Sequence, residues 1–481
     1  MDQTKPQDAA PAGGANAAPA SGWRWGPFTL RVPFLHLKFV PSQFIQGVVV
    51  ASGTSLIMAP VMIGYFGLSF EESLALLLLV NTVLCASFLL FGEPFAPGML
   101  TPAFPLVLTF IVSGYPEGAV RFQVMTALSL SLAAIALLFS LSGLSRRLMS
   151  ALPVALKAGI IFGAAISALD RVFVKDISLF QNHPISATTA LLVALLFTFS
   201  APMQALRAKH KWLDSLSSLG LLPGFVAAAV VGALVGEIQF EMRWGLFLPP
   251  VAETLAKVSP LSIGWPPLSM YLEVLPLAFV AYVILFGDFV TGSEMIRSAQ
   301  PARQDDPIDT NFERSQIAVA LRNAVSAVIA PLFPYQGILW TGVHAVIIQT
   351  WRGGRQKMVD LHSGIGSYYG FGLPLIYLCW PWISLIKPIM AIALMLTLAL
   401  TAFACIMVAA PLVKKPLEMV CALVIGYMLA MFDVWTALAA AVFLLIFING
   451  NLPSRRKTAD SAEHSSEHRQ EQPSQVAAAG D

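Results

Sequence analysis

The sequence predicts an all-α integral membrane protein with about fourteen transmembrane segments, arranged as two inverted seven-span repeats with short extended segments in spans three and ten. Of its 481 residues, 57% are apolar and 12% are charged, and its mean hydropathy is +0.72. Soluble domains average about 45–50% apolar and about 25% charged residues. The net charge of +2 indicates no nucleic-acid partner. The lipid bilayer is the partner that this composition predicts.

Apolar stretches of about 20 residues, the length that crosses a bilayer, recur along the chain. Regular candidates lie near 42–66, 70–91, 120–141, 151–169, 188–206, 221–236, 270–293, 314–333, 364–380, 384–410, 416–432 and 434–450. Two irregular stretches, 95–113 and 334–350, are broken by Pro or Gly in their first halves. These two come third and tenth in the order of spans, so they occupy equivalent places in two halves of seven.

Short basic clusters predict the orientation, because Lys and Arg gather in cytoplasmic loops. They follow even-numbered spans, at Arg146–Arg147, Arg207–Lys211, Arg352–Lys357, Lys414–Lys415 and Arg455–Lys457. We therefore expect a multi-pass protein of the bacterial inner membrane with both termini in the cytoplasm. Both ends of the chain are polar and low in complexity. We expect residues 1–41 to form a disordered or interfacial cytoplasmic tail, and residues 451–481 to form a disordered cytoplasmic tail.

The broken spans predict a site in the middle of the membrane. Unwound backbone leaves N–H and C=O groups unpaired, which is tolerated at membrane depth only where they line a cavity or bind something. The half-helices that follow, from Phe104 and Gly342, would point their positive dipole ends at the same place. Two ordinary kinked helices are the alternative. Cys85, Cys379, Cys405 and Cys421 form no CxxC pair, so neither a disulfide framework nor a metal site is expected.

Several local motifs resemble one family of transporters. The motifs are Gln46…Gly53…Pro60 in the first span, Thr101-Pro102-Ala103-Phe104 in the third, Pro153…Gly159…Gly163 in the fifth, and Trp340-Thr341-Gly342-Val343-His344 in the tenth. They resemble the nucleobase–cation symporters (nucleobase–ascorbate transporters) and the related sulfate permeases, over roughly residues 40–450.

The resemblance implies a core domain that holds the substrate and a gate domain against which it moves, as in an elevator. The core would comprise 42–141 and 270–380, and the gate 142–269 and 381–450. Substrate would lie between the extended halves of spans three and ten, facing an acidic residue of span eight, a position that Asp288 fits. Gly342 fits a glycine of the span-ten motif, but Val343 stands where the family has an acidic residue. We also expect a homodimer formed through the gate domain.

Three charged residues are candidates for coupling. An ionisable group inside a span costs about 2.5–3.5 kcal/mol on insertion scales, so Asp288 should face a cavity or a partner. Glu294 lies six residues further along the same span, where a solvated helix end is the alternative. Arg322 in span nine could neutralise Asp288 or face an anionic substrate, and snorkelling to the interface is the alternative.

The remaining candidates surround the broken spans. His344 could relay a proton or bond a heterocycle, and packing explains it equally well. Trp340 and Phe104 could stack on a planar ring, and Gln46 and Thr101 could donate hydrogen bonds to substrate or merely to other helices. The predicted substrate-binding residues are Asp288, Thr101, Ala103, Phe104, Trp340, Thr341, Gly342, His344 and Gln46.

Taken together, these features predict a secondary active transporter of a small, nucleobase-like solute, driven by proton or sodium symport. The alternative is a sulfate-permease-like transporter of an inorganic or organic anion, because the second carboxylate that grips a nucleobase is missing at Val343. No GxSxG motif and no Walker-type phosphate loop occurs, so an enzyme, an ATP-driven pump or any cofactor is not expected. A channel is also disfavoured, because the few intramembrane polar residues cluster at one depth.

Overall fold

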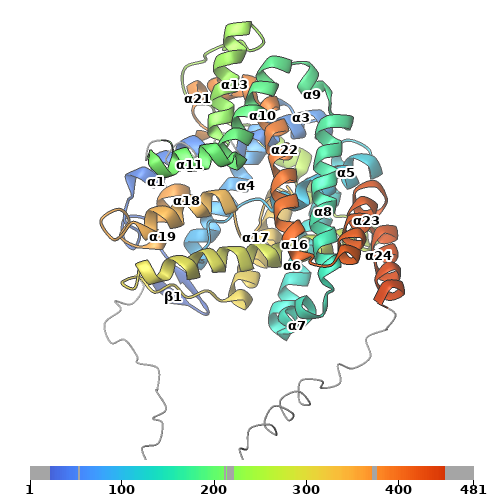
Figure 1. The fold of residues 1–481 in the computed structure, drawn as a ribbon. Helices are drawn as coiled ribbons and strands as arrows, with labels where there is room; N and C mark the ends of the chain where they lie inside the picture. Colours follow the sequence, from blue (N-terminus) through green and yellow to red (C-terminus); the bar gives the residue numbers. More distant parts are fainter. Residues whose placement is uncertain (1–21, 52–54, 211–212, 214–220, 371–375, 450–481) are drawn as a thin grey trace, which may run out of the picture.

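The computed structural model describes residues 22–449 except 52–54, 211–212, 214–220 and 371–375. Most of the described chain is helical, and a short hairpin precedes the first helix (Figure 1). The predicted tails 1–21 and 451–481 and the motif residue Gly53 lie outside the described residues. Figure 1 shows the hairpin and the end of the last helix at the same end of the molecule.

The helices pack in two groups, and each group combines segments from both halves of the chain. In the first group, α17 packs on α6 and α4, α16 on α6 and α18, and α19 on α1. In the second group, α8 packs on α22 and α23, and α10 on α13 and α22. Helices α14 and α15 fall in the predicted gate segment 142–269 but pack on α4 and α6 of the first group, and the division into a core and a gate domain stays a prediction.

The first group contains the following elements: α1 (Pro41–Gln46), η1 (Gly47–Ala51), η2 (Leu56–Met58), α3 (Ala59–Phe66), α4 (Phe70–Phe91), η3 (Thr101–Ala103), α5 (Phe104–Gly114), α6 (Ala119–Ser142), α14 (Val251–Val258), α15 (Pro260–Ile263), α16 (Leu268–Ala299), η5 (Gln300–Ala302), α17 (Phe312–Ile329), α18 (Thr341–Arg352) and α19 (Leu361–Tyr369).

The second group contains the elements that follow: α7 (Leu144–Ala151), α8 (Val154–Asp170), η4 (Arg171–Lys175), α9 (Ser178–Gln181), α10 (Pro184–Phe199), α11 (Ala201–Lys209), α13 (Leu222–Val235), α21 (Trp380–Ile386), η6 (Lys387–Ile389), α22 (Met390–Ala409), η7 (Ala410–Leu412), α23 (Pro416–Met431) and α24 (Val434–Asn449).

Among the described residues, four helical segments are long and apolar enough to cross a membrane: α4, α6, Leu268–Ala302 and Trp380–Leu412. A fifth results if α7 and Val154–Lys175, which are bent by 90°, count as one span. Shorter apolar helices such as α10, α13 and α23 lie at other predicted spans. The structure thus supports a multi-pass membrane protein, and the fourteen-span inverted repeat stays a prediction.

The N-terminal hairpin is a feature that the sequence did not predict. Strands β1 (Trp23–Trp25) and β2 (Phe28–Leu30) pair antiparallel, and the Trp25 ring packs beside Phe28 and Phe91. Arg31, which is buried, donates to the carbonyl of Gly92 at the end of α4 (2.8 Å). Residues 25–31 therefore pack on α4, whereas Lys38 and Val40 bond to Ser363 and Ser367 of α19. The interfacial position predicted for this part of the tail stays a prediction.

Local sequence fixes both ends of α4, the helix that leads into the first broken span. Ser69 and Glu72 form a reciprocal capping box at its start. Gly92 ends it with a φ of +62° in the left-handed region, where glycine is favoured. A Cβ at Gly92 would lie 2.4 Å from the Thr29 carbonyl oxygen. The chain therefore leaves the helix at this point and runs extended toward Thr101.

Candidate functional site

The extended halves of spans three and ten pair with each other. Gly98 and Gly337 form an antiparallel bridge, and Trp340 N–H donates to the carbonyl of Ala96 (2.8 Å). Leu100 N–H also donates to the carbonyl of Pro334 (2.9 Å). We call the stretches 96–100 and 334–340 the strand pair. The two breaks predicted from sequence are confirmed, and the strand pair satisfies part of the backbone that the breaks unwind.

A helix begins directly after each stretch of the strand pair. The 3-10 turn η3 and α5 follow the first stretch, and α18 follows the second at Thr341. Thr341 and Gly342 are exposed, and no atom lies within 4 Å of a Cβ built on Gly342. Thr101 is half-buried, and its hydroxyl donates to the carbonyl of Met99 (3.2 Å). Both helices thus present N-terminal N–H groups, which lack partners within a helix, near the strand pair.

Asp288 lies on the face of α16 that is turned toward the strand pair. Side chains four residues apart share a helix face, and Gly292, four residues on, packs against Phe95 and Leu339 of the two broken spans. Asp288 is half-buried. Among the described residues, its carboxyl group has no hydrogen-bond or ion-pair partner. An intramembrane carboxyl group without a partner is the chemical feature expected of a coupling site.

Other predicted substrate contacts lie deeper than expected. Ala103 and Phe104 are 1% and 3% exposed. His344 is fully buried, its Nδ1 accepts from Ala96 N–H (3.4 Å), and its ring lies beside Phe95. His344 therefore supports the first stretch of the strand pair, and all three side chains are buried, unlike Thr341.

Trp340 and Gln46 occupy intermediate positions. Trp340 is half-buried, and its Cβ would lie 2.6 Å from a Cβ placed on Gly98, so its ring packs over the strand pair. Gln46 ends α1, where its buried Oε1 has no partner among the described residues. No contact of Gln46 with the strand pair is found in the described chain, and its role stays a prediction.

The two other coupling candidates do not contact Asp288. Glu294 is exposed on the surface of α16 and pairs with Arg297 (2.6 Å). Arg322 is 6% exposed, and it donates to the Ser87 hydroxyl (3.1 Å) and to the carbonyls of Gln336 and Gly337. Arg322 thus holds the backbone of the span-ten stretch in place.

Buried polar side chains that the sequence did not single out also support the broken spans. Tyr369 donates to the carbonyl of Pro97 (2.6 Å), and Gln336 donates to the carbonyl of Val80 (3.1 Å). Tyr335 donates to Asn81, which in turn donates to Tyr377. A polar residue such as Asn81 inside an otherwise apolar span is the signal that could have found this network.

Glu93 forms a second cluster at the start of the first broken span. Its carboxylate accepts from Arg314 (2.6 Å) and from the Ser315 hydroxyl on α17. Asp309 also pairs with Arg314 (2.8 Å), on the exposed side of the cluster. In the part of the chain that the structure describes, no group of three His, Cys, Asp or Glu side chains has the arrangement of a metal site.

No protein-family model matches the sequence, and no curated protein matches it. The solved structures that are similar in fold include the following three. SLC26A9 has 14% sequence identity and a TM-score of 0.50, over 85% of this chain and 66% of the other. Murine Slc26a9, an anion transporter in its inward-facing state, has 15% identity and a TM-score of 0.47, over 85% and 68%. The transmembrane domain of the cyanobacterial bicarbonate transporter BicA has 15% identity and a TM-score of 0.43, over 86% and 100%.

The likeness to SLC26A9 shows a shared fold. This chain spans about two thirds of the length of the SLC26A9 chains that it matches. At 14% identity this likeness concerns the fold, and the choice between the two families that the sequence resembles stays a prediction.

Proposed function

We propose that this protein is a secondary transporter that moves a small anion together with a proton, and that the anion binds between the N-termini of α5 and α18. The observation that carries this proposal is the strand pair, from which two helices start beside the unpartnered carboxyl group of Asp288. Helix N-termini favour negative charge. SLC26A9, with which the chain shares its fold, is an anion transporter.

Asp288 supplies the coupling in this proposal. Two like charges about 6 Å apart repel by about 2.8 kcal/mol at an effective dielectric constant of 20, which weakens binding about a hundredfold. The anion therefore binds well only when Asp288 carries a proton. Proton and anion enter the site together, so uptake should increase as the pH on the side of entry falls.

The test is anion uptake into proteoliposomes with an imposed pH gradient. Labelled sulfate, chloride and a dicarboxylate are offered, and acid outside should drive accumulation, whereas a sodium gradient should not. In Asp288→Asn the amide mimics the protonated carboxyl group, so downhill anion uptake should persist while the pH gradient loses its effect.

Glu294→Gln is the matched control, because it neutralises a carboxylate on the same helix that is exposed and already paired. This variant should keep the full response to the pH gradient. Retention of that response in Asp288→Asn, or its loss in Glu294→Gln, would remove Asp288 from the coupling role.

A nucleobase-like solute is the second candidate, and the half-buried Trp340 over the strand pair is the observation that favours it. An aromatic contact contributes about 0.5–1.5 kcal/mol beyond the area it buries. A thermal-shift screen separates the two classes, since a ligand at a hundred times its Kd adds about 2.7 kcal/mol of stability. Stabilisation by uracil or xanthine that is lost in Trp340→Ala, with no effect of anions, would replace the anion proposal.

A further inference from the structure

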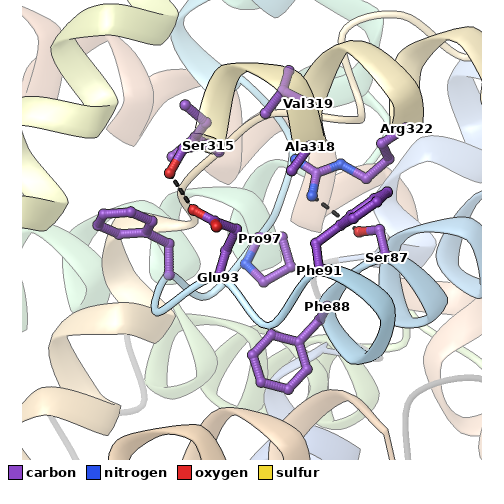
Figure 2. A pocket seen from close by; sticks show the side chains of 11 residues that line it. Ser87, Phe88, Phe91, Glu93, Pro97, Ser315, Ala318, Val319 and Arg322 are labelled. Carbon is purple, nitrogen blue, oxygen red and sulfur yellow. Dashed lines mark hydrogen bonds between the residues drawn. The ribbon is translucent and has the colours of Figure 1, made fainter. Parts of the chain in front are cut away.

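A small buried cavity lies behind the strand pair, between the end of α4 and α17. Its lining includes Glu93, Arg322, Ser87, Ser315 and Ala318, and Figure 2 shows the Glu93 and Arg322 side chains at this cavity with the two serines beside them. The cavity leaves about 20 Å³ for the centre of a water molecule. One water requires about 10–15 Å³ on this measure, so the space fits a single water molecule.

The polar groups at the cavity have hydrogen-bond donors and acceptors that are not used by protein partners in the described chain. Arg322 uses its two terminal nitrogens for Ser87 and for two backbone carbonyls, and its buried Nε–H has no acceptor. The carboxylate oxygens of Glu93 each accept one described bond, from Arg314 and from Ser315, although a carboxylate can accept about four. An unsatisfied donor on a buried guanidinium is costly, which calls for an acceptor in the cavity.

The charges argue for water over an anion. No direct ion pair joins Arg322 to a carboxylate within the described chain, and Glu93 is the carboxylate that lines the same cavity. A second anion placed between them would be repelled by Glu93. A water molecule accepts from the Arg322 Nε–H and donates to Glu93, which satisfies both groups at once.

We propose that this cavity is a buried water site that bridges Glu93 and Arg322, and that the bridge makes both of them positioning residues for the substrate site. Arg322 holds the carbonyls of Gln336 and Gly337, and Gly337 pairs with Gly98. Glu93 stands at the start of the other extended stretch and ties it to α17 through Arg314 and Ser315. The water therefore links the supports of both stretches that lead to the helix N-termini. The positioning role rests on the proposed function, whereas the water site does not.

The first experiment is a double-mutant cycle measured by thermal unfolding of the purified full-length protein, a readout that requires no transport. Glu93→Gln, Arg322→Gln and the double variant are compared. If water links the two groups, the double variant should be no less stable than the less stable of the two single variants. The folding equilibrium constant of the double variant should then differ by more than about twofold from the value expected if the two single effects multiplied independently.

Asn323 provides the matched control cycle. It donates to the same Gln336 carbonyl as Arg322 (3.0 Å) but does not line the cavity. Combined with Glu93→Gln, Asn323→Ala should act independently. Independent effects in the Arg322 cycle, or equal coupling in both cycles, would overturn the water bridge. If Arg322→Gln does not fold, Ser87→Ala replaces it, since the Ser87 hydroxyl lies at the cavity and bonds the same guanidinium.

The second experiment identifies the occupant and tests the positioning role. Crystals grown with bromide should show an ordered water and no anomalous peak at the cavity, and a bromide peak or an empty cavity would refute the water site. In uptake assays, Glu93→Gln should raise KM for the anion more than it lowers the maximal rate, and Glu93→Asp should partly restore KM. An intact water site with unchanged KM would overturn the positioning role alone, and loss of all anion uptake in the unmodified protein would instead refute the proposed function.

Discussion

Replacing Gly337 by alanine should force the strand pair apart, because the new methyl group has no space. A Cβ at this position would lie 2.7 Å from the carbonyl oxygen of Gly98 and 3.0 Å from the nitrogen of Leu100. Both atoms belong to backbone, which cannot rotate away as a flexible side chain would. The two stretches must therefore separate by a few tenths of an ångström.

The cost follows from these contacts. Overpacking a well-filled interior costs about 1–3 kcal/mol. Separation also weakens the bond from Leu100 N–H to Pro334 (2.9 Å), and a net hydrogen bond contributes about 0.5–1.5 kcal/mol. We expect Gly337→Ala to lose about 2–4 kcal/mol of stability by these two effects. Because the strand pair precedes both helix N-termini, anion uptake should fall as well.

The assay is thermal unfolding in detergent, followed by uptake in proteoliposomes. Gly64→Ala is the control: Gly64 lies in α3, and nothing approaches a Cβ there within 4 Å. Alanine stabilises a helix interior by up to about 1 kcal/mol relative to glycine, so this variant should unfold at the same or a higher temperature. If Gly337→Ala unfolds at the same temperature as Gly64→Ala and transports normally, the strand pair does not support the site.

Three further predictions concern single positions. Gly342→Asp should abolish anion uptake without loss of thermal stability, because its Cβ meets no atom within 4 Å and an acidic side chain at a helix N-terminus is favourable; uptake at the normal rate would move the anion site elsewhere. Tyr65→Phe should lower stability by about 0.5–1.5 kcal/mol in thermal unfolding, because it removes the hydrogen bond from the Tyr65 hydroxyl of α3 to the Asp176 carboxylate (2.5 Å) after η4. An unchanged unfolding midpoint would show that this bond contributes nothing. For topology, a thiol introduced at Asn182 should react with a membrane-impermeant reagent from outside and one at Arg355 should not, and the opposite labelling would invert the predicted orientation.

Sequence predicted the two breaks, because Pro and Gly within an apolar run disrupt helical hydrogen bonding locally. The pairing of the breaks depends on contacts between residues more than two hundred positions apart, such as Gly98 with Gly337. No local pattern determines that register. The hairpin at 23–30 was missed for a related reason: its stability comes from contacts with Phe91 and Gly92 of a later helix.

The candidate site was harder to predict, because sequence shows which residues are polar but not which way they face. His344 and Arg322 resemble site residues in an apolar span, yet both are buried against the broken backbone. Glu93, by contrast, lies directly after the glycine that ends α4, a position typical of a solvated helix end. The structure shows it bonded to α17.

Several buried polar side chains of the first helix group share one task, and Asp288 does not take part in it. Unwound backbone at membrane depth must find partners within the protein. The carbonyls of the broken spans find them in Arg322, Asn323 and Tyr369, each of which donates to one or more of these groups. Such residues are explained by structure alone.

Asp288 differs from these residues, because no hydrogen bond joins its carboxyl group to those carbonyls in the described chain. It has no described partner, although burial of a charge in this setting is costly. A carboxyl group without a described partner, on the face of α16 turned toward the strand pair, is the group expected to bind the proton in the proposed transport cycle. That is why Asp288, rather than the more strongly bonded Arg322, is the position at which substitution should separate anion movement from the proton gradient.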